Sequence, residues 1–299
     1  MLISEAARGE GGRLYYIENG QRVYFMEDHY GEKGNLMPRD IVSKCIYDAP
    51  SQVYLDVAFL GEKVIRSRLL EVAQVCKKYA GIDVEKESIP VYPSVHFFMG
   101  GLAVDAQHKT SIDHLYAIGE CASRYHGANR LGGNSLLAAI YGGRIAAKAI
   151  AELPTSDILP DFDVYIAEQT AAVAKVLDSN SRFSAIYVRN EIAKLMNDCL
   201  GITRTAEKLN EGISNVDYYL SIGDKLIFDS DVSPYVGYSI KPMLLLARAI
   251  LTSALERKET RGAHIRNDYP ERSAEYDRCS VCSYDNGAHH VSFEKEDGQ

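Results

Sequence analysis

The sequence predicts an α+β protein, and three observations support this class. Short apolar runs separated by turn residues fill the first hundred positions, as is typical of a small sheet with helices packed on it. Beyond residue 160, apolar residues recur at helical spacing, which predicts a helical bundle. Nowhere does a strand lead into Gly-x-Gly-x-x-Gly, so the sequence shows no complete dinucleotide-binding fold.

The N-terminal third is predicted to begin with a hairpin. Asn19-Gly20 lies between apolar runs at residues 13–17 and 22–26, and Asn-Gly in this position is a strong hairpin signal. The next elements are expected after Pro38: a helix over residues 40–47, a strand over 53–57 and an amphipathic helix over 62–79.

The middle of the chain is rich in glycine and predicts two strands, 101–104 and 115–118, followed by a long helix of small residues over 134–152. Pro154 and Pro160 mark a boundary. The periodicity beyond it predicts helices over residues 161–179, 182–200, 204–223 and 241–258. Asp285-Asn286-Gly287 predicts a final hairpin over residues 279–293.

The composition of the 299 residues, 46% hydrophobic and 25% charged, is that of a soluble globular protein. A net charge of -8 argues against a nucleic-acid partner, and no apolar run approaches the roughly 18 residues of a membrane span. Six cysteines do not form a disulfide framework in a chain this long, which favours a reducing cytoplasm. Cys279 and Cys282 form a C-x-x-C motif without a second pair, so no metal site is predicted.

The densest polar cluster is a glycine-rich loop, residues 126–133, which carries Arg130 and leads into a predicted helix at Asn134. A helix start exposes unpaired N–H groups and a partial positive charge, which suit an anionic ligand or an electron-rich ring oxygen. The alternative is structural: Asn134 or Ser135 caps the helix, and Arg130 is a surface cation.

Several motifs occur in a fixed order along the chain. The central ones are His96-Phe97-Phe98-Met99-Gly100-Gly101, then Leu115 to Ala122, then His126 to Leu137. Others bracket them: Glu5 with Arg8-Gly9-Glu10-Gly11-Gly12, Pro38-Arg39-Asp40, Arg261-Gly262-Ala263-His264 and Asp268-Tyr269-Pro270. Together they resemble the C-terminal portion of flavoproteins of the fumarate reductase, succinate dehydrogenase and L-aspartate oxidase family, over roughly residues 1–275.

The resemblance implies that Arg39 donates a proton and that Glu5 and Arg8 form a relay to it. Arginine normally stays protonated, so it serves as an acid only when it is buried, held against the substrate carbon and resupplied by neighbours. The three-residue spacing of Glu5 and Arg8 lets them meet on one turn. Judged without the resemblance, Arg39 more simply forms an ion pair with Asp40 at a helix start.

The resemblance also implies that His96 and Arg130 hold the two carboxylates of a dicarboxylate, because the planar fork of arginine binds a carboxylate bidentately. Ser4 is expected to add a hydroxyl to this site, and a further substrate-binding histidine is expected upstream of it. As a lone residue, His96 is more simply a structural histidine.

FAD is the implied cofactor. Glu120 matches a carboxylate that contacts FAD, and Asn134, Ser135 and Leu136 begin a helix whose positive end would face the flavin ring. The implied chemistry is hydride exchange between flavin N5 and a dicarboxylate carbon, with Arg39 moving the proton on the neighbouring carbon.

The implied domains are a partial substrate-capping domain, the returning segment of an FAD-binding α/β domain, a helical domain and a tail with a hairpin. Their expected bounds are 1–93, 94–153, 154–272 and 273–299. The N-terminal Rossmann-like half is missing from this sequence, so we expect the returning segment to expose apolar surface.

The favoured function is an FAD-dependent oxidoreductase that interconverts fumarate and succinate. Leu131-Gly132-Gly133 resembles that branch more than L-aspartate oxidase, which remains the alternative enzyme. A third hypothesis is a non-catalytic fragment or complementing subunit of a split flavoprotein. The expected partners are a small dicarboxylate and either an N-terminal complementing chain or an iron–sulfur electron-transfer subunit. The short tail after Arg272 favours a cytoplasmic protein, peripheral at the membrane through a partner.

Overall fold

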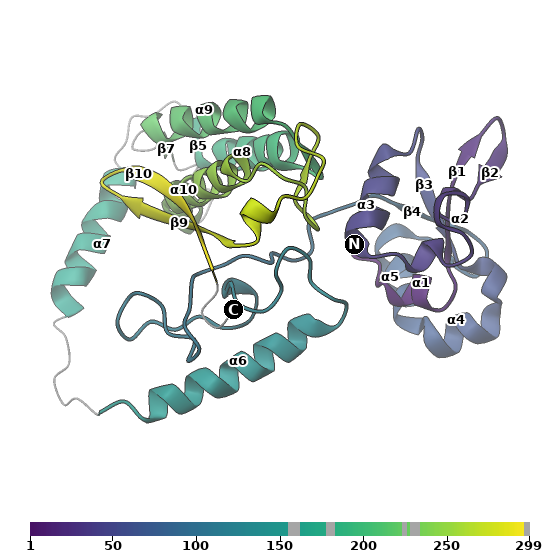
Figure 1. The fold of residues 1–299 in the computed structure, drawn as a ribbon, viewed down its shortest axis with the longest axis horizontal. Coiled ribbons are helices and arrows are strands. Elements are labelled where there is room, and N and C mark those ends of the chain that lie inside the picture. Colours follow the sequence, from purple (N-terminus) through teal and green to yellow (C-terminus); the bar gives the residue numbers. More distant parts are fainter. Residues whose placement is uncertain (155–161, 178–182, 223–225, 228–233, 296–299) are drawn as a thin grey trace. The chain divides into compact units, whose positions relative to one another are not determined.

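A computed structural model describes residues 1–154, 162–177, 183–222, 226–227 and 234–295. The chain forms two compact units, Met1–Phe97 and Phe98–Gln299 (Figure 1). Both contain helices and strands, so the α+β prediction is confirmed.

Unit 1 is built on an antiparallel sheet of four strands in the order β2-β1-β3-β4. Their bounds are β1 Arg13–Glu18, β2 Gln21–Val23, β3 Val53–Asp56 and β4 Ile89–Val91. The predicted hairpin is present: Asn19 and Gly20 have φ of 50° and 78°, the positive values that a two-residue hairpin turn requires. The second strand is shorter than predicted, because Phe25 already begins a helix and buries its ring in the core.

The helices of unit 1 are α1 Ala6–Gly9, α2 Phe25–Tyr30, α3 Arg39–Asp48, α4 Glu62–Arg68 and α5 Leu70–Ala80. Helix α3 confirms the helix predicted after Pro38. The single helix predicted over 62–79 is wrong, because Leu69 leaves helical geometry (φ −121°, ψ 23°) and divides it in two. Its side chain is buried in the core with Ile65, Leu55 and Ile89, which explains why an apolar residue stands at the break.

The first part of unit 2 is mostly loop. The strands predicted over 101–104 and 115–118 are wrong: the structure forms only single bridges there, Leu102 with Ala122 and Lys109 with Tyr116. In the part of the chain that the structure describes, neither segment lies beside a strand along its length, so no ladder can form.

Helix α6, Asn134–Ala151, confirms the helix predicted over 134–152. Its first two turns expose large apolar side chains, with Leu136 73%, Leu137 65% and Ile140 71% accessible. This observation matches the expectation that the segment exposes apolar surface.

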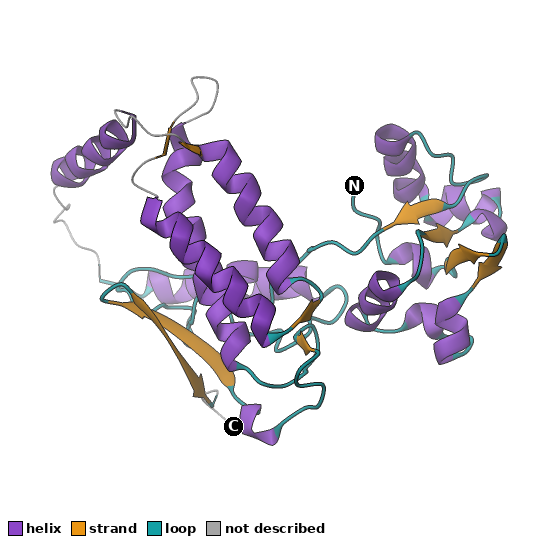
Figure 2. Cartoon of the chain, turned by 90° about the horizontal axis from the view of Figure 1, so that it is seen from above, coloured by secondary structure: helices purple, strands orange, loops and turns teal. Residues whose placement is uncertain are grey.

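The rest of unit 2 contains a helical bundle with a two-stranded hairpin against it (Figure 2). The bundle helices are α8 Ala185–Leu200, α9 Ala206–Ile222 and α10 Pro234–Glu256, which share one core. Helix α7 Phe162–Leu177 precedes them, and those of its side chains that the structure describes are exposed. Predicted helix residues 161, 178–179, 182 and 223 lie outside the described residues. Helix α9 begins after Arg204 because Thr203–Arg204 (β6) pairs with Ile265–Arg266 (β8), and Phe183–Ser184 (β5) likewise pairs with Leu226–Ile227 (β7).

Helix α10 begins one to two turns before the predicted start at residue 241, because it continues through Pro242. It is the one helix in the described ranges that is long and apolar enough to cross a membrane by length and composition. Ile240, Leu244, Ala247 and Leu251 are buried at helical spacing within the core shared with α8 and α9. This buried stripe assigns α10 to the core of the bundle.

The predicted C-terminal hairpin consists of β9 Cys279–Asp285 and β10 Ala288–Glu294. Asn286 and Gly287 have φ of 49° and 82°, as in the first hairpin. The hairpin packs on α10, and Arg257 next to that helix donates to Ser280 Oγ at 3.0 Å.

Candidate functional site

In unit 1 the carboxylate of Glu5 joins two arginines. Its Oε1 lies 3.1 Å from Arg8 Nη2, and its Oε2 accepts from Arg39 Nε at 2.7 Å. The first contact is the one-turn pairing that the spacing predicts. The guanidinium of Arg39 therefore contacts the carboxylate of Glu5, although the two residues are 34 positions apart in the sequence.

Arg8 is the most enclosed member of this trio. Its side chain is 11% accessible, against 38% for Glu5 and 34% for Arg39, and it also donates to the backbone carbonyls of Asn35 and Met37. Burial lowers the pKa of Arg8; Glu5 opposes this effect and Arg39 adds to it. The arrangement places a buried cation behind a carboxylate, with a second cation on the more open side.

In unit 2 the loop before α6 carries Arg130, which is buried at 7% exposure and donates to the carbonyl of Leu131 at 3.3 Å. Burial, and then the charge of Arg130, lower the pKa of the neighbouring His126. Since Arg130 is buried, the alternative of a surface cation is wrong. A buried arginine in a loop is a group held for a ligand or for structure.

Helix α6 begins at Asn134, with Gly133 at the cap position in left-handed geometry (φ 79°). Asn134 and Ser135 are therefore not the N-cap residues, and the capping alternative is wrong. The N-cap residue Gly133 makes no side-chain cap hydrogen bond, and a Cβ there would meet nothing within 4 Å. Glu120, the carboxylate predicted to contact FAD, accepts a hydrogen bond from the backbone N–H of Phe98 at 2.9 Å.

The remaining predicted residues are exposed. Ser4 accepts the N–H of Ala6 at 3.3 Å, and His96 lies in the irregular segment at the end of unit 1. The structure therefore brings Glu5, Arg8 and Arg39 together in unit 1. Glu120, Arg130, Asn134, Ser135 and Leu136 belong to unit 2.

A buried ion network in unit 2 was not predicted to have a structural role. Glu259 is fully buried and accepts from Arg257 at 2.6 Å, from Arg261 at 2.7 and 3.0 Å, and from the N–H of Ser273 at 3.0 Å. Burial by itself raises the pKa of Glu259, but these hydrogen bonds outweigh it and lower the pKa. The only sequence signal is the density of arginines between residues 257 and 272.

His264 belongs to the same region and is held as a neutral ring. Arg204 donates to its Nδ1 at 2.7 Å, and its Nε2 lies 3.0 Å from the carbonyl of Arg257, which can only accept. Burial, together with three nearby arginines, lowers the pKa of His264 to about 4. Burial and Arg266 likewise lower the pKa of Arg204 to about 10, so Arg204 remains charged at neutral pH.

We expect acid to destabilise unit 2 through His264. Because its native pKa lies below the unfolded value of about 6.5, the unfolded state binds a proton first. The contribution of neutral His264 to the free energy of unfolding is complete above pH 6.5 and is lost as the pH falls toward 4. Between pH 7 and pH 5 the loss is roughly 2 kcal/mol. Urea unfolding at both pH values should show that His264→Gln removes this part of the pH dependence. The exposed His290→Gln should retain it; equal slopes in all three proteins would contradict the expectation.

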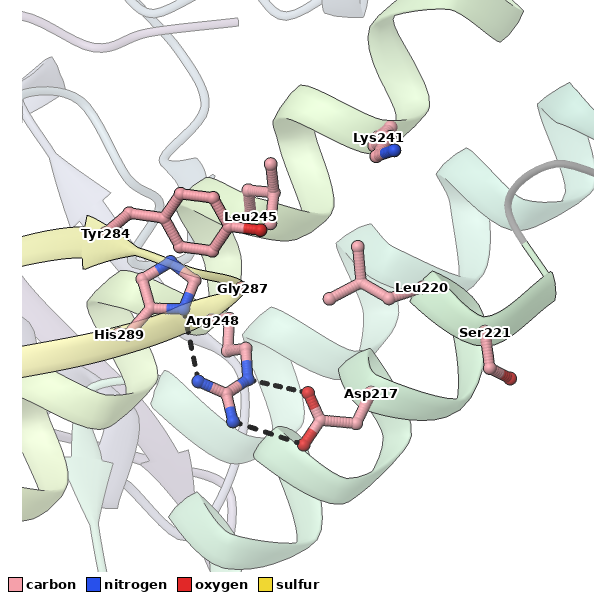
Figure 3. Close-up of a pocket in the computed structure, with 9 residues that line it drawn as sticks. All are labelled: Asp217, Leu220, Ser221, Lys241, Leu245, Arg248, Tyr284, Gly287 and His289. Atoms are coloured by element: carbon pink, nitrogen blue, oxygen red, sulfur yellow. Dashed lines mark hydrogen bonds and ion pairs between the residues drawn. The ribbon is translucent and has the colours of Figure 1, made fainter.

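A cavity of about 390 Å³ lies in unit 2 between α9, α10 and the C-terminal hairpin (Figure 3). Arg248 pairs there with Asp217 at 2.6 Å, and its Nη1 lies 3.1 Å from His289 Nδ1. Burial, and then the charge of Arg248, lower the pKa of His289. None of the predicted site residues lines this cavity, so it is separate from the residues predicted for flavin and dicarboxylate.

Comparisons with known proteins agree along the chain. The FAD binding domain family matches residues 1–136, and the family described as fumarate reductase flavoprotein C-term matches residues 189–298. The succinate dehydrogenase flavoprotein subunit of Bacillus subtilis is 33% identical over 297 residues, which cover 91% of this chain and 50% of that protein. The L-aspartate oxidase of Pseudomonas aeruginosa is 34% identical over 280 residues, which cover 90% of this chain and 49% of that protein.

Solved structures give the same result. A quinol–fumarate reductase with menaquinol molecules matches with a TM-score of 0.87 and 29% identity, over 99% of this chain and 57% of that one. The quinol fumarate reductase of E. coli matches with a TM-score of 0.84 and 28% identity, over 99% of this chain and 56% of that one.

The fold and these matches define the class of the family, whose members are FAD-dependent oxidoreductases. The chain belongs to the family that includes the succinate dehydrogenase and fumarate reductase flavoprotein subunits and L-aspartate oxidase. The predictions of this family and of FAD as its cofactor are confirmed. The chain spans about half the length of the curated relatives it matches.

Proposed function

We propose that the chain provides the dicarboxylate-binding and proton-transfer residues of an FAD-dependent oxidoreductase that interconverts fumarate and succinate. The observation that carries the proposal is the carboxylate of Glu5 between Arg39 and Arg8, with Arg39 on the more accessible side. Relatives named succinate dehydrogenase and fumarate reductase flavoprotein subunits support it.

The residues at the start of α6 fit the flavin end of FAD. Gly133 leaves open space at the cap, Leu136 is exposed, and the N-cap residue has no side chain of its own to cover the first-turn N–H groups. Such groups, with the positive end of the helix dipole, suit an electron-rich ring edge. Asn134, Ser135 and Leu136 would hold the ring, and Glu120 would contact the cofactor. When bound, FAD supplies the two-electron chemistry.

The chain's own residues account for binding and proton movement. Arg130 binds one carboxylate through its planar guanidinium, His96 binds the other, and Ser4 offers a hydroxyl. One alkene carbon of fumarate receives a hydride, and Arg39 gives a proton to the other. Glu5, 2.7 Å from Arg39 Nε, passes on to Arg39 a proton that it receives from Arg8, and Arg8 is reprotonated from solvent.

An FAD titration tests whether the cofactor residues suffice. We expect quenching of flavin fluorescence that saturates near one FAD per chain, together with a shifted visible absorbance. Leu136→Asp, which puts a negative charge at the helix start, should weaken binding at least tenfold, about 1.4 kcal/mol. The control Leu246→Asp changes a leucine of α10 that is also largely exposed (62%, against 73% for Leu136). Equal affinity in both variants would contradict the placement of the flavin.

L-aspartate oxidase is the second candidate, because a relative of that name is 34% identical. Anaerobic addition of L-aspartate to the oxidised flavoprotein separates the two, since an aspartate oxidase bleaches its flavin and the proposed enzyme responds to succinate.

We further propose that the protein works in the cytoplasm with a segment that supplies the phosphate-binding glycines. An iron–sulfur subunit as electron partner, with peripheral attachment to a membrane, fits relatives that are subunits of such enzymes.

A further inference from the structure

The loop over residues 125–133, which carries Arg130, is held at two points by residues outside it. We propose that His108, through Tyr125, and Gly262, through Ala128, are positioning residues that set the affinity for the dicarboxylate. This inference rests on the function proposed above, since it needs Arg130 to bind a carboxylate.

The first anchor is a buried histidine. His108 is fully buried, and its Nδ1 lies 2.8 Å from the carbonyl of Ala117. The carbonyl can only accept, so Nδ1 carries the proton and Nε2 accepts from the Tyr125 hydroxyl at 2.5 Å. Helix α6 leaves the ring no room to move, because a Cβ on Gly142 would come 2.8 Å from its Cε1. Tyr125 at the start of the loop is thereby fixed.

The second anchor is a tight turn. Ala263 donates its N–H to the carbonyl of Ala128 at 3.0 Å. Gly262 has a φ of +56°, and a Cβ there would lie 2.5 Å from the same carbonyl oxygen, so only glycine allows the approach. Arg261 and His264 close the turn with backbone hydrogen bonds of 2.8 and 3.0 Å. The side chain of Arg261 rests on the buried Glu259, which makes the turn rigid.

Ala128 is two residues from Arg130, so a shift of the anchored carbonyl moves the guanidinium with it. A misplacement of about 1 Å at a positioning group can lower activity by up to about 100-fold. Neither anchor needs to contact substrate in this role. Their loss should therefore weaken substrate binding and leave the chemical step, which depends on Arg39, nearly unchanged.

The test uses Tyr125→Phe, which removes only the hydroxyl, and Gly262→Ala. The control Tyr141→Phe removes the hydroxyl of a neighbouring tyrosine, whose ring lies edge-on to that of Tyr125 with a centroid distance of 6.0 Å. In the flavin-loaded protein, both test variants should raise the KM for fumarate about tenfold and leave kcat within about twofold. Trypsin should cleave after Arg130 about threefold faster or more, relative to cleavage after Lys86 in unit 1.

Each outcome decides a different point. Unchanged trypsin cleavage in Tyr125→Phe overturns the anchoring, and faster cleavage with an unchanged KM overturns the positioning role. A lower kcat at unchanged KM also overturns it. If the wild type binds FAD but fumarate is not reduced, the proposed function fails, and with it the link to dicarboxylate affinity; the trypsin result then still decides the anchoring. Tyr125→Phe keeps the test decisive should Gly262→Ala fail to fold.

Discussion

Arg39→Gln should lower kcat for fumarate reduction by about 100-fold to 10,000-fold, the range for loss of a general acid. Glutamine keeps a polar side chain of similar length but has no proton to give. The structure supports so large an effect because Arg39 donates from Nε to the Glu5 carboxylate at 2.7 Å, the group proposed to resupply its proton. Steady-state reduction of fumarate by a viologen donor measures it.

The matched control is Arg13→Gln, which removes another partly exposed arginine of unit 1 that pairs with a glutamate, Glu27, at 2.7 Å. That variant should keep kcat within about twofold, because Arg13 has no part in the proposed proton transfer. The loss of a partly exposed ion pair also changes the stability of the fold little. Glu5→Gln should also lower kcat, since the carboxylate that returns the proton is lost. Equal rates for Arg39→Gln and Arg13→Gln would remove Arg39 from the mechanism.

Glu259→Gln should lower the free energy of unfolding of unit 2 by about 3–5 kcal/mol, the usual cost of removing one partner from a buried ion pair. The carboxylate is fully buried and accepts from Arg257 and Arg261. Glutamine cannot balance these two charges, and its amide N–H₂ would face one of the donors. Urea unfolding followed by circular dichroism measures the change.

Glu211→Gln is the control for this experiment, because it breaks the exposed pair with Lys208 (2.9 Å) on α9. It should cost less than about 1 kcal/mol. A loss below 1 kcal/mol for Glu259→Gln would show that the network does not hold the C-terminal part of unit 2 together.

Local geometry was readable from the sequence where one or two residues determine it. Asn19-Gly20 and Asn286-Gly287 adopt the positive φ values that their hairpins require. The strands predicted over 101–104 and 115–118 failed because an alternating pattern shows which side chains are buried and not whether another strand is present to pair. The division of the helix at Leu69 depends on tertiary packing of that side chain, which no local pattern records.

The candidate site divides in the same way. Glu5 and Arg8 are three residues apart, and their contact follows from helical spacing. Arg39 lies 34 residues from Glu5 and was placed beside it only through the family resemblance. His108 gave no signal, because a lone histidine in a polar turn looks exposed in sequence while the fold buries it completely. Glu259 was missed for the same reason, since charged residues are expected at the surface.

Fumarate reduction with Arg39 as proton donor is tested most directly by rapid anaerobic mixing of fumarate with the FAD-loaded protein after chemical reduction of its flavin. We expect fumarate to restore the oxidised flavin spectrum within the turnover time in the wild type, and at least 100-fold more slowly in Arg39→Gln. Reoxidation at the same rate in both proteins would contradict the role of Arg39. A reduced flavin that does not respond to fumarate would contradict the proposed function itself.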